Sequence, residues 1–99
     1  MPDARLNGLK VSEAAYKNAK AILDYVEDNG LFQADVVGES VEADIGIAWC
    51  GLNRQISIEC YDCGSVYLAK FGKDYPAEIV ELCIDDLSEL PEFLKWTDV

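Results

Sequence analysis

Cysteine is the residue type in this sequence that could support the widest range of chemistry. The segment 59–65 reads ECYDCGS, in which Cys60 and Cys63 form a Cys-x-x-Cys pair followed by glycine. This spacing is compatible with half of a zinc site, with a redox dithiol, or with a tight turn between two β-strands. The other two cysteines, Cys50 and Cys83, stand alone, so no second Cys-x-x-Cys pair completes a zinc site.

The sequence contains no histidine, which is the commonest general base and the commonest metal ligand. It contains many carboxylates instead, and six of them fall near the C-terminal end: Glu78, Glu81, Asp85, Asp86, Glu89 and Glu92. Paired carboxylates can perform acid–base chemistry or hold Mg²⁺, but no recognisable motif fixes the spacing of these six. We therefore predict no enzymatic activity, no catalytic residues, no metal ligands and no cofactor. The acidic cluster is interpreted as a solvated face or as a partner-binding surface.

The overall charge restricts which classes of molecule the protein is expected to bind. Nineteen Asp and Glu residues against eight Lys and Arg residues give a net charge of −11. This charge repels nucleic acid, since binding to it requires cations that neutralise phosphates, and it disfavours anionic membranes. It favours a basic protein surface as the partner, although acidity of this kind also simply keeps a small protein in solution.

Length and hydropathy predict one domain, comprising residues 1–99, in the cytoplasm. No apolar run approaches the ~18 residues that a membrane span requires, and the N-terminal segment MPDARLNGLKV lacks the apolar region of a signal peptide. Cysteines in such a compartment are expected to be reduced. Residues 1–10, which include Pro2 and Gly8, are predicted to form a loose N-terminal arm.

The elements that must position these residues follow from the period of the apolar pattern. Helical spacing over 12–29 predicts a helix that begins after the N-cap residue Ser12 and stops at Asn29-Gly30. The period then changes to two, which predicts a meander of four to five antiparallel strands: 35–39, 45–50, 55–61, 66–71 and 77–84. A short helix follows, with Ser88 as its cap and Pro91 in its first turn. The predicted fold class is α+β.

A two-residue turn at Cys63-Gly64 determines where the cysteines point. It pairs Cys60 with Tyr67 and places Cys60 in the core and Cys63 at the turn, while Cys50 and Cys83 face away from the core. Four ligands must converge on one zinc ion, and these thiols point in at least two directions. The turn is therefore favoured over the zinc and redox interpretations.

The same register makes the outer sheet face unusually apolar. It places Ala48, Tyr61, Val66, Leu68 and Ile79 on that face, with only three charges: Glu59, Lys70 and Glu81. Exposed apolar patches of several hundred Å² typically mark interfaces, so a homodimer or a protein partner is expected to dock there. Two alternatives remain: a register error of one residue that exchanges the two faces, or the N-terminal arm covering the patch.

The segment 43–66, about a quarter of the chain, resembles a pattern found in small acidic bacterial proteins of unknown function, some of which are encoded on mobile elements. Gly46, Ile47 and Trp49 match the residue types of the Gly-Ile-x-x-Trp strand of that pattern, with one residue instead of two between Ile47 and Trp49. Ala48 stands where a Glu is usual, and Cys63 stands where Asp or Asn is usual in an Asp-Gly turn. The resemblance implies a genomic context rather than an activity.

Three functions are compatible with these observations. The first is a protein-binding inhibitor of the anti-defence, antitoxin or immunity type, which blocks a basic, nucleic-acid-handling protein. The second is a structural or assembly module that associates with itself through the outer sheet face. The third is a small zinc-binding protein that uses its cysteines.

Overall fold

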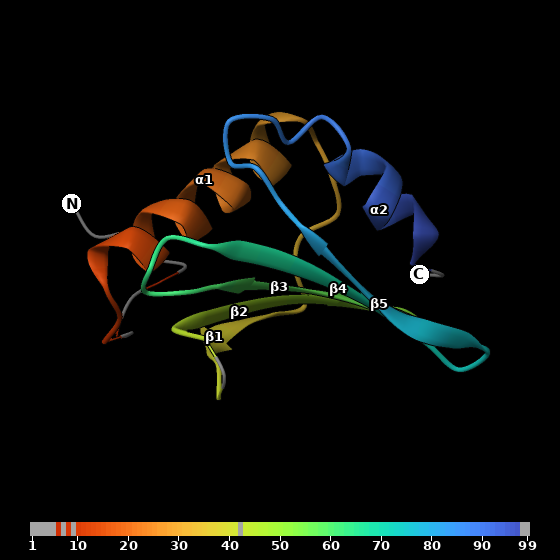
Figure 1. Cartoon of the computed structure of the whole chain (residues 1–99). Coiled ribbons are helices and arrows are strands. Elements are labelled where there is room, and N and C mark those ends of the chain that lie inside the picture. The colour runs from red at the N-terminus through yellow and green to blue at the C-terminus, as the bar shows by residue number, and fades with distance from the viewer. Residues whose placement is uncertain (1–5, 7, 9, 42, 98–99) are drawn as a thin grey trace.

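A computed structural model describes residues 6, 8, 10–41 and 43–97. It has two layers: a five-stranded antiparallel sheet, and two helices that both lie on one face of it (Figure 1). The elements in chain order are α1 (Glu13–Asp28), β1 (Val36–Glu39), β2 (Ile45–Cys50), β3 (Arg54–Cys60), β4 (Val66–Gly72), β5 (Tyr75–Glu81) and α2 (Leu90–Trp96). The strands pair in the order β1-β2-β3-β4-β5. The predicted α+β class is thus confirmed.

Both predicted ends of α1 are confirmed, and each is stabilised by specific hydrogen bonds. At the start, Ser12 Oγ accepts a hydrogen bond from Ala15 N–H at 3.2 Å, which satisfies one of the unpaired donors of the first turn. At the end, Gly30 has a φ of 63°. Leu31 N–H then donates to Val26 O at 2.9 Å, a pattern that closes helices on a left-handed glycine.

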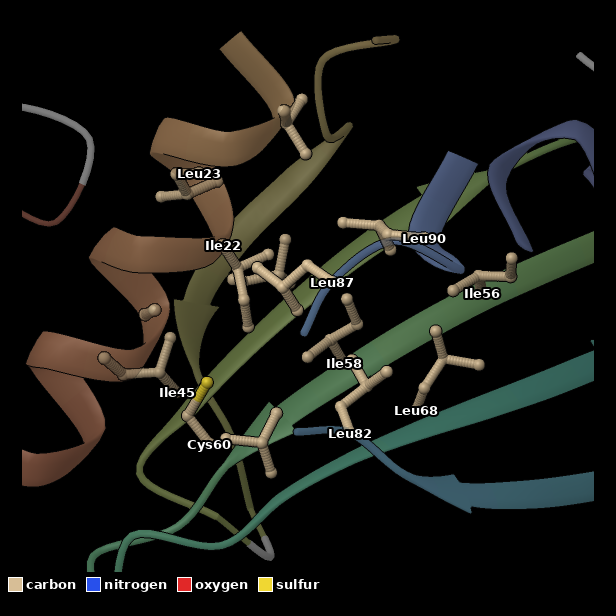
Figure 2. Close-up of a cluster of buried hydrophobic side chains, with 14 of the residues drawn as sticks. Ile22, Leu23, Ile45, Ile56, Ile58, Cys60, Leu68, Leu82, Leu87 and Leu90 are labelled. Carbon is tan, nitrogen blue, oxygen red and sulfur yellow. The ribbon is translucent and has the colours of Figure 1, made fainter. Parts of the chain in front are cut away.

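The core lies between the helices and the sheet. Apolar side chains from α1, β2, β3, β4 and the segment that leads into α2 meet there, and Figure 2 shows Cys60 with its sulfur among them. The buried residues of α1 are Ala15, Ala19, Ile22, Leu23 and Val26, the stripe expected from helical spacing.

Leu6 belongs to the same core and is almost fully buried. The prediction of a loose arm over 1–10 is therefore wrong at this position, because the Leu6 side chain is part of the buried hydrophobic cluster. Residues 1–5, 7 and 9 of the predicted arm lie outside the described residues. Since Leu6 packs on the helix side of the sheet, it does not cover the opposite face.

The β3–β4 hairpin differs from its prediction by one residue. Its loop has three residues rather than two: Tyr61 N–H donates to Ser65 O at 2.9 Å, and Gly64 has a φ of 93°. This is the three-residue hairpin loop that ends in a left-handed glycine. The extra residue shifts the register, so that Cys60 pairs with Val66 and Ile58 with Leu68.

A shift of one residue turns every side chain of a strand to the other face. Val66 and Leu68, predicted on the outer face, are consequently buried in the core, and Leu68 has no exposed surface. Tyr67, Ala69 and Phe71 take the outer face in their place. The predicted faces of the β4 side chains are thus wrong, whereas the predicted turn at Gly64 is present, within a loop that is one residue longer.

The C-terminal region departs from its prediction in two ways. β5 begins at Tyr75 and ends at Glu81, so the predicted strand 77–84 is displaced toward the N-terminus. Ser88 is not the cap of α2: its hydroxyl donates to Asp86 Oδ1 at 2.6 Å, and Glu89 occupies the cap position without a side-chain hydrogen bond. Pro91 lies in the first turn of α2, as expected.

Candidate protein-docking face

The sheet surface opposite the helices is the candidate site, and we call it the outer face (Figure 1). Strand pairing assigns its side chains, since residues directly opposite each other on antiparallel strands point to the same side. The outer face comprises Val36, Gly38, Gly46, Ala48, Cys50, Gln55, Ser57, Glu59, Tyr67, Ala69, Phe71, Ile79 and Glu81, with Tyr61 at its end. Within the described part of the chain, no helix lies over this surface.

Several outer-face side chains are apolar and open to solvent. Val36 is 55% exposed, Phe71 43% and Ile79 70%. A half-solvated antiparallel sheet normally carries polar residues on its open side. Phe71 and Ile79 line a common hollow, whereas Val36 lies on the opposite edge strand, and large exposed apolar side chains on such a face favour a docking role.

The charges on the outer face all have one sign among the residues that the structure describes. Glu59 and Glu81 point outward, whereas Lys70 does not, contrary to the prediction that placed it beside them. The shifted register turns Lys70 to the helix side, where its ammonium lies 4.7 Å from the centroid of the Trp96 ring and 3.5 Å from Glu78 Oε2. The outer face therefore has carboxylates without a neighbouring cation of its own.

A hollow of about 300 Å³ lies in the outer face, and its lining combines aromatic rings with a carboxylate. The residues around it are Glu59, Tyr61, Tyr67, Ala69, Phe71 and Ile79. The rings of Tyr61 and Tyr67 meet edge to face, with centroids 5.6 Å apart and planes at 87°. The Tyr61 hydroxyl donates to Glu59 Oε2 at 3.1 Å, which orients that carboxylate.

The predicted partner-binding residues are divided between different parts of the molecule. Ala48, Tyr61, Ile79 and Glu81 lie together on the outer face. Val66 and Leu68 do not join them, because both are core residues.

The other acidic residues of the predicted site do not form one face with Glu81. Glu78 lies beside Lys70 on the helix side. Asp85 and Asp86 are exposed in the segment after β5, and Glu89 and Glu92 are exposed at the start of α2. Hydrogen bonds from the side chain and then the backbone of Ser88 lower the pKa of Asp86, so its carboxylate is engaged within its own turn.

Two aromatic residues of the hollow, Tyr67 and Phe71, were missed from the sequence because the two-residue turn placed them in the core. The signal that could have found them is Gly64, since a left-handed glycine also closes the three-residue hairpin loop. The two loops differ by one residue and give opposite assignments for the whole of β4.

The cysteines are buried or exposed as the sequence predicts, although Cys83 follows β5 instead of lying within it. Cys60 is buried in the core, whereas Cys50, Cys63 and Cys83 are exposed, and all four are free thiols. Burial raises the pKa of Cys60 to about 12, which makes it a poor nucleophile and a poor metal ligand. Hydrogen bonding with the side chain and then the backbone of Ser65 lowers the pKa of Cys63. Within the described ranges, no three Cys, Asp or Glu side chains gather in a way that could hold a metal ion.

No family model, curated protein sequence or solved structure matches the chain. Neither helix described here has both the length and the apolar character needed to cross a membrane. The arrangement of the outer face is accordingly the basis for the function proposed below.

Proposed function

We propose that the protein is a small acidic inhibitor that binds a basic, nucleic-acid-handling protein through its outer face. One observation carries the proposal: an open sheet surface that combines exposed apolar side chains with the carboxylates of Glu59 and Glu81. Apolar burial supplies binding free energy at about 25 cal/mol per Å². The carboxylates and the net charge of −11 select a cationic surface and accelerate encounter with it.

The size of the outer face sets what the partner must cover. Five strands about 4.8 Å apart, with about six residues each at ~3.4 Å, give a plan area of roughly 500 Å². A stable interface buries about 800 Å² on each partner. The partner therefore has to reach beyond the sheet to its rim, where Asp62 is exposed at the β3–β4 loop. A basic partner gains favourable charge pairs from such an extension.

A second copy of the chain fits the outer face less well. Two molecules with a charge of −11 each repel one another. Docking face to face would also bring Glu59 and Glu81 of both copies into one low-dielectric interface, where unpaired charges are costly. Self-association is accordingly the alternative against which the proposal is tested.

The test compares the wild type with two variants that each remove one exposed aliphatic side chain. Ile79→Ser changes the outer face, and Val41→Ser changes the exposed β1–β2 loop. Tagged proteins are used to capture a partner from the source organism, and the partner is identified, purified and assayed with nucleic acid. We expect a basic partner that wild type and Val41→Ser bind, that Ile79→Ser loses, and whose activity falls as the wild type is added.

Salt provides the second measurement. Affinity should decrease as ionic strength rises, because the complex depends on opposite charges. A partner that is acidic, indifferent to salt or retained by Ile79→Ser would refute the proposal. Sedimentation of the free protein tests the alternative: a dimer that Ile79→Ser disrupts and Val41→Ser does not would assign the outer face to a second copy.

A further inference from the structure

The hollow of the outer face has a feature that specifies the chemistry of its occupant. Glu59, Tyr67 and Glu81 lie side by side on β3, β4 and β5, because Tyr67 pairs with Glu59 on one side and with Glu81 on the other. Directly opposed residues have Cβ atoms about 5 Å apart. One aromatic ring is thus flanked by two carboxylates, and neither carboxylate has an ion-pair partner among the described residues.

The second tyrosine completes the site. Tyr61 packs its ring against that of Tyr67 and donates its hydroxyl hydrogen to Glu59 Oε2. Glu59 retains its other oxygen for a further donor. Aromatic faces attract cations, and the attraction strengthens where water is excluded. The rings and the Glu59 carboxylate line the hollow of about 300 Å³, and Glu81 adjoins it on the other side of Tyr67. Together these groups complement a cation with an extended apolar stem.

Arginine matches this site better than lysine does. Its guanidinium group is planar, so it stacks on an aromatic ring while its N–H groups point sideways to carboxylates on both flanks. On the helix side of the same sheet, an arginine of the chain itself lies against aromatic rings, with neutral oxygens rather than carboxylates as its acceptors. There the Arg54 guanidinium lies 4.6 Å from the Tyr75 ring centroid and 5.3 Å from that of Trp96, and it also donates to the Tyr75 hydroxyl and to Trp96 O.

We propose that the hollow receives an arginine side chain of the protein partner, with the guanidinium over the Tyr67 ring between Glu59 and Glu81. This inference rests on the proposed function, since it names the partner group that enters the docking face. The arginine stem lies against Phe71 and Ile79, which line the same hollow.

The test uses three capped peptides that differ in one side chain: acetyl-Gly-Arg-Gly-amide, its lysine analogue, and its citrulline analogue, which is neutral and nearly isosteric with arginine. Each is titrated into the full-length protein and followed by the shifts of backbone amide NMR signals. We expect the arginine peptide to shift signals of residues 59–61, 67–71 and 79–81 in a saturable way. The citrulline peptide should not do so, and the lysine peptide should bind more weakly.

A pair of double variants separates the site from the general acidity of the protein. Glu59→Gln with Glu81→Gln removes the two flanking carboxylates, and Glu89→Gln with Glu92→Gln removes the same charge from exposed positions around the start of α2. The first double variant should lose about tenfold in affinity for the arginine peptide, since two charge-assisted contacts are removed. The second should stay within about twofold of the wild type, because screened distant charges contribute little.

Three results would overturn the inference: equal binding of the citrulline or lysine peptide, equal losses in the two double variants, or shifts spread over the whole acidic surface. Shifts of the same signals on raising protein concentration alone would show that a second copy fills the hollow instead. If the peptides fail while partner binding still requires Ile79, the arginine site is refuted and the proposed function stands. If partner binding is indifferent to Ile79, the proposed function itself fails.

Discussion

Individual side chains of β4 have opposite roles according to the face they occupy. Leu68 is fully buried between the helices and the sheet, whereas Phe71 is 43% exposed on the outer face. The contribution of an apolar side chain to stability depends on how much of it leaves water on folding. These two positions therefore distinguish the observed register from one shifted by a single residue, in which Leu68 faces outward and Phe71 enters the core.

Leu68→Ala should reduce the free energy of unfolding by about 2–5 kcal/mol, because it deletes buried methyl groups and leaves a cavity. Phe71→Ala should cost clearly less, although phenylalanine is the larger residue, since much of its ring is already in water. Urea denaturation of both variants and the wild type measures the difference. A larger loss for Phe71→Ala than for Leu68→Ala would contradict the register.

Cys60 links stability to pH in the alkaline range. Burial holds the pKa of its thiol at about 12, against an ordinary value of 9.0 in the unfolded chain. The stabilisation is fully present below pH 9 and is lost as the pH rises toward 12, since only the unfolded chain releases the proton there. The free energy of unfolding should therefore fall by at most about 1.4 kcal/mol per pH unit from this group.

The matched control for that prediction is Cys60→Ala, which removes the titrating group and keeps a small apolar side chain in the core. Urea denaturation between pH 8.5 and pH 10.5 should give a smaller slope for Cys60→Ala than for the wild type. Equal slopes would mean that Cys60 does not titrate differently in the folded and unfolded states.

At the scale of elements, α1 is tied to the sheet through its first turn. Ser12 accepts a hydrogen bond from Ala15 N–H with its hydroxyl oxygen, and its own N–H donates to Asp44 Oδ2 at 2.8 Å, just before β2. One residue therefore caps the helix and joins it to the β1–β2 loop.

Ser12→Ala should lower the free energy of unfolding by about 1 kcal/mol, since the Ala15 N–H loses its partner. Ser12→Asn is the control, because asparagine retains a capping oxygen without adding a charge beside Asp44. It should remain within a few tenths of a kcal/mol of the wild type in urea denaturation. Equal losses in the two variants would refute the capping role of the Ser12 side chain.

At the scale of the whole molecule, repulsion among like charges destabilises the compact folded state. The net charge is −11 after every Lys and Arg has been counted, so ion pairing leaves this excess of carboxylates unchanged. The described ion pairs are Lys20–Asp24, Lys70–Glu78 and Lys95–Glu92, and each includes at least one well-exposed partner. Exposed pairs contribute little to stability, so repulsion among carboxylates is the larger electrostatic effect of the folded state.

Added NaCl should therefore stabilise the protein. The urea midpoint is expected to rise between ~10 mM and ~300 mM NaCl, because the screening length falls from about 30 Å to less than 10 Å. The m-value should stay constant, since the surface exposed on unfolding does not change. The Glu89→Gln, Glu92→Gln double variant should show a smaller rise. A midpoint that falls with salt would show that attractive pairs dominate instead.

Much of the fold could be predicted from local sequence. Ser12 and Gly30 mark the ends of α1, and the alternating residues of β3 identify a strand, because caps and side-chain periods depend on the backbone of a few neighbouring residues. The core position of Cys60 follows in the same way from its place in that alternation. These features require no knowledge of which strands meet.

Which side chains form the outer face could be determined only from the tertiary structure. Which side of β4 faces the helices depends on whether the β3–β4 loop holds two residues or three, and Cys63-Gly64 is compatible with both. The observed register of β4 turns three of its side chains to the helix side: Val66, Leu68 and Lys70. The row of Glu59, Tyr67 and Glu81 forms only when β3, β4 and β5 are paired. Composition determined the acidity and the period of the apolar pattern determined the α+β class. Pairing between strands decided which side chains form the surface, because register is a long-range property that a one-residue difference reverses.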